Sequence, residues 1–161
     1  MAYLEKGDFL NAATWLEKAM NDVGNDRRAN ATKFLAQMHK DGIHPHASKD
    51  EALRLYGLIS GNAMPKIHMG FLYYFGKEIQ KDTSKGFDLI EKGIEQLKMQ
   101  NNDSDSYLTV EEYFSIASIY LNENMTKKTK EYLLKTIDKC GNNPYVSDIK
   151  AQAENILRQL N

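Results

Sequence analysis

An internal repeat with a spacing of 34 residues constrains the fold of this chain more than any other feature of its sequence. Small residues, large apolar residues and a terminal glycine align between residues 29–42 and 63–76, and Ala52 and Gly86 continue the same register. A repeating unit of this length cannot bury its apolar face alone, so consecutive copies must stack against one another. The spacing therefore predicts a short array of similar packed units.

Each unit is predicted to consist of two α-helices. Apolar residues recur at steps of three and four along the chain, whereas β-branched residues do not alternate with polar ones as in a strand. Two capping boxes, Ser48 to Glu51 and Thr109 to Glu112, mark helix starts. Glycines fall where helices are expected to end: Gly24, Gly42, Gly61, Gly76 and Gly141. We therefore expect an all-α fold with about eight helices of roughly 10 to 15 residues.

The repeat register predicts a single helical-repeat domain that covers residues 1–161. A third copy begins near Val110, and residues 7–19 have the pattern of a second helix with only a stub of a first helix before it. We expect a half-repeat at 1–25, repeats at 26–62, 63–106 and 107–142, and a capping helix at 143–161. Repeat arrays normally end in polar-faced caps, and the N-terminal half-repeat has none. We therefore expect a fragment of a longer protein, or a homodimer through the uncapped N-terminal helix.

Small residues are predicted at the contacts between paired helices, because they let two backbones approach closely. These positions are Ala36, Gly70 and Ala117 on first helices and Ala12, Ala52 and Gly86 on second helices. Large residues on the second helices are predicted to form the core between repeats. These residues are Trp15, Tyr56, Leu89 and Tyr132.

The second copy, from Ala63 to Ile94, carries a distinctive order of small, aromatic and acidic residues. The order is Met69-Gly70, Tyr73, Gly76, Ile79, Asp82, Lys85-Gly86, Leu89-Ile90 and Gly93. It resembles the Sel-one-like repeats of the tetratricopeptide superfamily. The copy from Ala29 departs from that pattern because its loop lacks the second glycine, and the first and third copies have the shorter turn of ordinary tetratricopeptide repeats. The resemblance implies a right-handed α-α superhelical solenoid of about three to four helix hairpins with a C-terminal capping helix.

The same resemblance implies a concave groove along the first helix of each hairpin. Its lining would be Lys33, Gln37 and Lys40 in the first copy, Ile67, Phe71 and Tyr74, with Phe75 beside them, in the second, and Glu111, Phe114, Ser118 and Leu121 in the third. An aromatic centre with a basic end is typical of surfaces that bind a peptide or a helix. The alternative is that residues 71–75 are buried between repeats. Five consecutive large apolar residues must point all round a helix, however, which predicts at least one exposed contact.

Such a groove predicts a non-catalytic scaffold or adaptor whose partner is another protein. By resemblance, Sel-one-like arrays assemble membrane-associated complexes, for example in protein quality control. The alternative is a helical repeat that binds single-stranded RNA. The balance of 21 Lys and Arg against 22 Asp and Glu makes nucleic acid an unfavourable partner. The lysines between 127 and 139 are interleaved with acidic residues and predict a solvated helix face.

The sequence contains no set of residues that predicts catalysis, a cofactor or a metal ion. The sequence contains neither of the two glycine-rich motifs that bind phosphate, G-x-x-x-x-G-K-[ST] and G-x-G-x-x-G. His39, His44 and His46 lie at a helix end and in a loop, without the carboxylates that orient metal ligands. Cys140 has no histidine beside it that could activate a thiol. We therefore expect a protein that is not an enzyme.

The cellular setting is predicted from cysteine usage and from the first residues. A single cysteine cannot form an internal disulfide, and the N-terminus has no secretion or transit signal. These features predict an intracellular protein, in the cytoplasm or in an organelle matrix such as that of mitochondria. No apolar run approaches the roughly 20 residues that a membrane-spanning helix needs, so no membrane insertion is expected.

Overall fold

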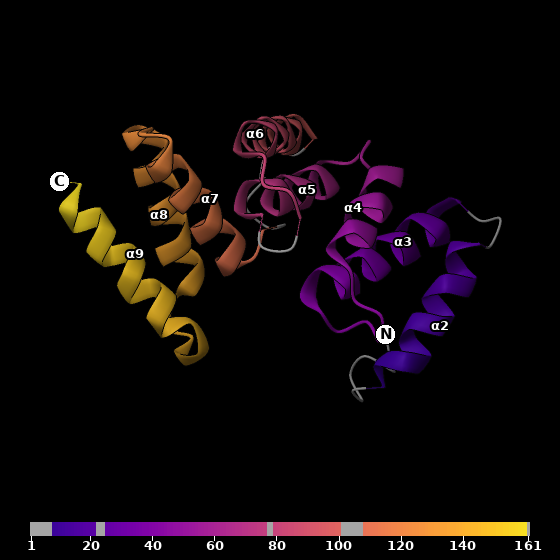
Figure 1. The fold of residues 1–161 in the computed structure, drawn as a ribbon. Helices are drawn as coiled ribbons and strands as arrows, with labels where there is room; N and C mark the ends of the chain where they lie inside the picture. The colour runs from indigo at the N-terminus through magenta and orange to yellow at the C-terminus, as the bar shows by residue number, and fades with distance from the viewer. Residues whose placement is uncertain (1–7, 22–24, 77–78, 101–107, 161) are drawn as a thin grey trace. The chain divides into compact units, whose positions relative to one another are not determined.

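The computed structural model describes residues 8–21, 25–76, 79–100 and 108–160, so the predicted helix end at Gly24 lies outside the described residues. All regular secondary structure in these ranges is helical, which confirms the all-α prediction (Figure 1). The helices are α2 (Phe9–Met20), α3 (Asn25–Asp41), α4 (Lys49–Leu58), α5 (Ala63–Phe75), α6 (Thr83–Gln100), α7 (Val110–Asn122), α8 (Thr126–Cys140), the short 3₁₀ helix η2 (Pro144–Val146) and α9 (Ser147–Gln159). Within this described part of the chain, none of the helices has both the length and the hydropathy to span a bilayer.

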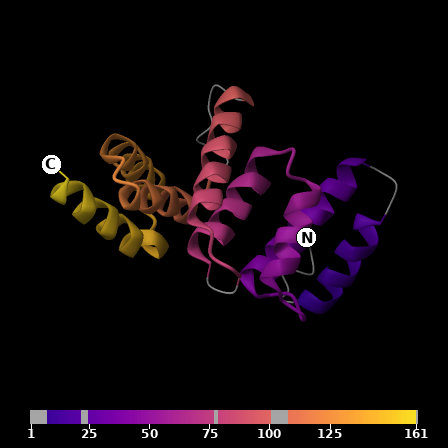
Figure 2. The ribbon, with the colours of Figure 1, turned by 45° about the horizontal axis from the view of Figure 1, so that its top comes forward.

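The chain divides into two compact units, residues 1–100 with α2 to α6 and residues 101–161 with α7 to α9. In unit 1 each helix packs on the next along the chain, and in unit 2 α7 packs on α8 and α8 on α9. Figures 1 and 2 both show α5 and α6 lying side by side. The division falls close to the predicted boundary between the second and third complete repeats. Each of those predicted repeats contains one pair of adjacent helices.

The two predicted capping boxes differ in the structure. At Thr109 the box is complete, because its hydroxyl accepts from the Glu112 N–H at 3.2 Å and the Glu112 carboxylate accepts from the Thr109 N–H at 2.9 Å. At Ser48 only half forms, in which the hydroxyl accepts from the Glu51 N–H at 3.3 Å. The Glu51 carboxylate instead accepts two bonds from Arg54, at 2.6 and 2.8 Å. The hydrogen bond from Arg54 also lowers the pKa of the Glu51 carboxyl.

Small residues hold α5 and α6 closer together than any side chain would allow. A methyl group on Gly86 would lie 2.6 Å from the Tyr74 nitrogen, and one on Gly70 would lie 2.8 Å from the Gly86 oxygen. A methyl group on Gly93 would lie 2.5 Å from Ile67. From Ile67 to Tyr74 along α5, the contacting residue on α6 moves back from Gly93 to Gly86, so the two helices are antiparallel. The predicted role of Gly70 and Gly86 is confirmed.

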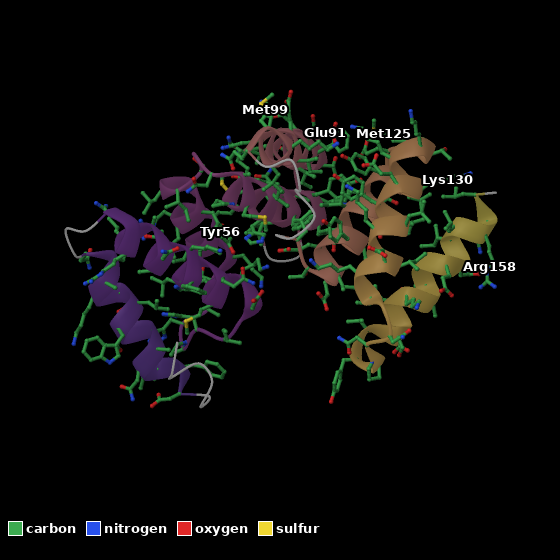
Figure 3. All side chains as sticks on the ribbon, turned by 180° about the vertical axis from the view of Figure 1, so that it is seen from behind. Tyr56, Glu91, Met99, Met125, Lys130 and Arg158 are labelled. Carbon is green, nitrogen blue, oxygen red and sulfur yellow. The ribbon has the colours of Figure 1, made fainter. Side chains whose placement is uncertain are left out.

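Two of the four predicted core residues, Tyr56 and Tyr132, are buried within their own unit. In unit 1 a cluster surrounds Tyr56, which lies among the helices, whereas Met99 at the end of α6 points outward (Figure 3). The buried members of this cluster are Leu35, Ala36, Ala52, Leu55 and Tyr56. In unit 2 the Tyr132 ring packs between Tyr113 and Tyr120, with ring centroids 6.1 and 5.3 Å apart. Tyr56 and Tyr132 are thus confirmed as core.

Trp15 was predicted to be core, and this prediction is wrong. Its side chain is 57% exposed, and the Lys18 ammonium lies 5.0 Å from the ring centroid. The face of α2 that packs inward carries Ala12, Ala13 and Leu16. Helix residues are about 100° apart, which places Trp15 outside that face. Leu89, from the same predicted set, is half-buried.

Candidate functional site

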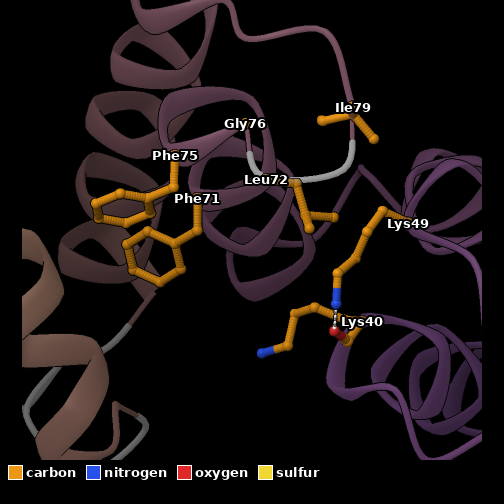
Figure 4. Close-up of a pocket in the computed structure, with 7 residues that line it drawn as sticks. All are labelled: Lys40, Lys49, Phe71, Leu72, Phe75, Gly76 and Ile79. Carbon is orange, nitrogen blue, oxygen red and sulfur yellow. Dashed lines mark hydrogen bonds between the residues drawn. The ribbon is translucent and has the colours of Figure 1, made fainter.

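An open pocket of about 390 Å³ lies in unit 1, where the end of α3, the start of α4 and the end of α5 meet (Figure 4). Its size falls within the range of small ligand pockets, about 300–1,000 Å³. The described lining residues are Lys40, Lys49, Phe71, Leu72, Phe75, Gly76 and Ile79. The pocket therefore combines an apolar wall from α5 with two lysines from α3 and α4.

The apolar wall exists because the side chains of residues 71–75 point to all sides of α5. Tyr74 is buried, Phe71 and Leu72 are half-buried, and Phe75 is 43% exposed. The expectation that at least one residue of this segment is exposed is thus met by Phe75. The Phe71 and Phe75 rings lie 6.3 Å apart on successive turns, and they point to the same side in Figure 4.

A chain reversal after α5 supplies the far side of the pocket. Gly76 ends the helix with φ +54°, a left-handed conformation that glycine adopts without steric cost. The Asp82 N–H then donates to the Tyr73 oxygen at 2.9 Å, which holds the returning chain against α5. A methyl group on Gly76 would lie 2.5 Å from Lys81, so the reversal also requires the absence of a side chain. The turn brings Ile79 to the pocket wall.

The basic side of the pocket is built at the junction of α3 and α4. The Lys49 ammonium donates to the backbone oxygen of Lys40, shown as a dashed line in Figure 4, and so satisfies a carbonyl at the end of α3. The Lys40 ammonium lies 3.5 Å from the Asp41 carboxylate, which also accepts from Gln37 at 2.6 Å. No carboxylate is found among the described residues that line the pocket.

Two members of the predicted groove, Lys40 and Phe71, come together in this pocket with Phe75, which was named beside them. Gln37 lies one turn before Lys40, but its carbonyl accepts from the Tyr56 hydroxyl at 3.0 Å and its amide donates to Asp41. Lys33 is exposed on α3, with its ammonium 5.9 Å from the Phe34 ring. Of the three groove positions predicted in the first copy, Lys40 is the one found among the described residues that line the pocket.

Ile67 and Tyr74, also in the predicted groove, are buried against α6. Residues at positions i, i+3 and i+7 of a helix form one stripe, and Ile67, Gly70 and Tyr74 have this spacing. The stripe packs on Gly86 and Gly93, so neither side chain offers a surface to a partner. Phe71 lies at the edge of this stripe and reaches the pocket.

The predicted groove positions of the third copy lie on α7, in unit 2. Phe114, Ser118 and Leu121 are half-buried, and Glu111 is exposed. The Ser118 hydroxyl donates to the Phe114 oxygen at 2.9 Å, as hydroxyls in helices often do. None of the described lining residues of the pocket belongs to this unit.

Sequence analysis missed Lys49, Leu72, Gly76 and Ile79 as pocket residues. Lys49 follows the N-cap Ser48 and is read from the sequence as the first residue of a helix. Gly76 is read as a helix end, and it is one. The sequence contained one signal for these residues, a glycine that ends a helix directly after a run of aromatic residues. The chain reverses at such a glycine, and the residues after it return against the aromatic run.

His39 and His44 have a structural role, because they stack on each other and accept backbone N–H groups of the segment between α3 and α4. The His39 and His44 rings are stacked with centroids 3.9 Å apart. Each Nδ1 atom accepts a backbone N–H, from Ser48 at 3.2 Å and from His46 at 3.0 Å respectively. Burial, and after it the charge of His44, lowers the pKa of His39. The described part of the chain contains no cluster of three or more His, Cys, Asp or Glu arranged for a metal ion.

The remaining candidate chemical groups are packed into the two cores. His68 is buried, and its ring centroid lies 5.2 Å from that of Tyr56. Cys140 is buried at the end of α8, 3.8 Å from the Val146 oxygen. Burial raises the pKa of its thiol, which keeps the sulfur protonated and weakly nucleophilic at neutral pH.

Comparison of the chain with protein-family models, with curated proteins and with solved structures gives no match. The likeness to Sel-one-like repeats therefore depends on the sequence positions given above. The chemistry of the pocket is the observation from which a function can be argued.

Proposed function

We propose that this chain is a non-catalytic interaction scaffold that binds a peptide or helix of another protein in the pocket between α3, α4 and α5. The observation that carries the proposal is the pair of neighbouring aromatic rings of Phe71, which is half-buried, and Phe75, which is exposed, in a pocket large enough for an apolar side chain. Single exposed apolar residues are common on protein surfaces, but a concave apolar cluster with a polar rim is typical of a binding site.

The fold proposed for this role is the right-handed superhelical solenoid of Sel-one-like hairpins. The 34-residue spacing and the close approach of α5 and α6 at Gly70 and Gly86 support it. Stacked hairpins present first helices on a concave side, where extended partners bind. The pocket includes residues of two such first helices, Lys40 on α3 and Phe71 on α5.

The pocket supports a moderate affinity. Burying one Leu or Phe side chain contributes roughly 1.5–3 kcal/mol. A micromolar dissociation constant corresponds to about 8 kcal/mol of binding free energy. One anchor in this pocket must therefore be supplemented by contacts along the partner segment, which favours a peptide or helix over a small molecule.

The lining of the pocket supports binding rather than catalysis. Its described titratable groups are two lysines, and one of these, Lys49, already donates to a backbone carbonyl. A general acid or base needs a group that changes protonation near neutral pH. Phe71, Leu72, Phe75 and Ile79 offer only apolar contact.

The test is a selection of random peptides displayed on phage against the immobilised chain, followed by fluorescence anisotropy with each recovered peptide. Phe75→Ala should weaken binding at least about tenfold, because it removes an aromatic contact of a kind that dominates interfaces. Leu58→Ala is the matched control, since Leu58 is another exposed apolar residue of unit 1 outside the pocket, and it should leave binding unchanged.

Two outcomes would overturn the proposal. Peptides that bind both variants as tightly as the unaltered chain would place the binding surface elsewhere. A labelled single-stranded RNA that binds in the same assay, while no peptide does, would favour the RNA-binding alternative. Circular dichroism of each variant verifies that the helices are retained.

A further inference from the structure

Two buried histidines hold the segment between α3 and α4 against the end of α3. The His39 and His44 rings are stacked with centroids 3.9 Å apart, and the two residues are only 6% and 8% exposed. His39 Nδ1 accepts the Ser48 N–H, and His44 Nδ1 accepts the His46 N–H. A backbone N–H donates only to a ring nitrogen that carries no hydrogen. Both rings are therefore neutral in this arrangement, with their hydrogen on Nε2.

A proton on either ring breaks this arrangement. A charged imidazolium donates from both of its nitrogens and accepts at neither, so the N–H of Ser48 or of His46 loses its acceptor. Because the ring centroids of His39 and His44 lie 3.9 Å apart, a charge on one ring also disfavours a charge on the other. The stack is thus compatible with two neutral rings and is opposed by two charged ones.

Glu17 on α2 gives His44 a second contact that depends on charge. The Glu17 carboxylate lies 3.6 Å from His44 Nε2, slightly too far for a hydrogen bond. A charged His44 ring is attracted to this carboxylate on α2 and is repelled by a charged His39 ring on α3. Protonation therefore changes the helix that His44 favours.

The charged groups around the two rings come from α2, α3 and α4. Among the described residues they are Glu17, Lys40, Asp41, Lys49, Glu51 and Arg54. Two ion pairs, one on α3 at 3.5 Å and one on α4 at 2.6 Å, involve four of these groups. Burial, and after it the charge of His44, lowers the pKa of His39, and Arg54 acts in the same direction. The carboxylates of Glu51 and Glu17 offset this lowering only in part, so the fold favours the neutral ring.

We propose that His39 and His44 form an acid-sensitive latch that releases residues 42–48 from the end of α3 when the rings become charged. Since the pKa of His39 is lowered, the latch is closed above its ordinary pKa of 6.5 and opens as the pH falls through the lower folded value. Opening also removes the acceptor of the Ser48 N–H, so α4 should fray from its first turn. The latch concerns the segment between α3 and α4 and does not depend on the proposed function.

The test combines long-range ¹H–¹⁵N NMR correlation of the imidazole rings with amide hydrogen exchange, between about pH 8 and pH 5. At the upper end of this range His39 and His44 should carry hydrogen on Nε2 alone. On acidification the amide protection of Ser48 and His46 should fall at least about tenfold beyond the intrinsic dependence of exchange on pH. Amides in the middle of α7, in unit 2, should keep their protection over the same range.

His44→Gln and His46→Gln form a matched pair of variants. Glutamine can still accept the His46 N–H through its amide oxygen but cannot become charged, so in His44→Gln the titration of His39 should move up toward 6.5. His46 is an exposed histidine of the same segment and contributes its backbone N–H to the latch. His46→Gln should therefore leave the titration of His39 in place.

Three results would overturn the latch. They are hydrogen on Nδ1 of either ring at neutral pH, constant protection of the Ser48 amide while His39 becomes charged, and an equal shift in the two variants. Should His44→Gln fail to fold by circular dichroism, Glu17→Gln gives the same decision, because Glu17 is exposed and its carboxylate favours the charged form of His39. The titration of His39 should then move to lower pH, and an unchanged titration would contradict the coupling between α2 and the latch.

Discussion

Replacing Gly86 by alanine is expected to destabilise unit 1 by about 2 kcal/mol. The added methyl group would lie 2.6 Å from the Tyr74 nitrogen and 2.8 Å from the Gly70 oxygen, and these backbone atoms cannot rotate away. Restoring ordinary contact requires α5 and α6 to separate by about 1 Å, and such overpacking costs up to about 3 kcal/mol. The better helix propensity of alanine offsets at most about 1 kcal/mol of this cost.

The measurement is urea unfolding followed by circular dichroism, in which a loss of 2 kcal/mol lowers the midpoint by about 1 M. Gly57→Ala in α4 is the matched control, because nothing lies within 4 Å of the methyl group it adds. This control should be neutral or stabilising by up to about 1 kcal/mol. A Gly86→Ala chain that is as stable as the unaltered one would refute the close approach of α5 and α6.

Three further predictions concern the caps and the titratable groups. Thr109→Ala removes the hydroxyl of the complete capping box and should lower the stability of unit 2 by about 1 kcal/mol in urea unfolding, whereas Thr126→Ala, at a helix start without a side-chain cap, should change it far less. The pKa of His39 is lowered in the folded chain, so the fold favours the neutral ring; its contribution is present above the ordinary pKa of 6.5 and is lost as pH falls through the lower folded value. Unfolding midpoints should therefore fall on acidification below about pH 6.5, and His39→Gln should flatten that dependence; an unchanged profile would contradict the role of His39. Cys140 should react with a thiol reagent only slowly at neutral pH and rapidly once urea unfolds unit 2, because burial both shields the sulfur and raises its pKa.

The close packing of α5 and α6 could be predicted because the residues involved leave no other interpretation. Gly70 and Gly86 are helix residues at positions where a small residue recurs at the repeat spacing, after Ala36 and Ala52, and a helix keeps glycine there at a cost in propensity. The required backbone contact explains that cost. Trp15 was less informative about burial, because a large aromatic residue fits the apolar periodicity of a helix both when it faces the core and when it lies at the edge of the packed face. Its burial depends on the neighbours that α2 has in space.

The pocket was predictable only in part for a similar reason. Phe71, Tyr74 and Phe75 are all large and apolar, so composition does not tell which of them packs on α6 and which faces outward. The glycines of α6 decide the matter, because they place Tyr74 against the helix backbone. Ile79 enters the lining through the chain reversal at Gly76, a tertiary arrangement that helical periodicity does not encode.

The incomplete capping box at Ser48 shows how tertiary partners override a local rule. The motif predicts that the Glu51 carboxylate accepts the Ser48 N–H, but that N–H already donates to His39 Nδ1 at 3.2 Å. The carboxylate is free to bind Arg54 on its own helix instead, at 2.6 and 2.8 Å. Thr109 has no such competitor among the described contacts, and its box closes. One buried imidazole thus caps α4 from α3, so the start of α4, and with it Lys49 at the pocket, is fixed by a residue that the local motif does not contain.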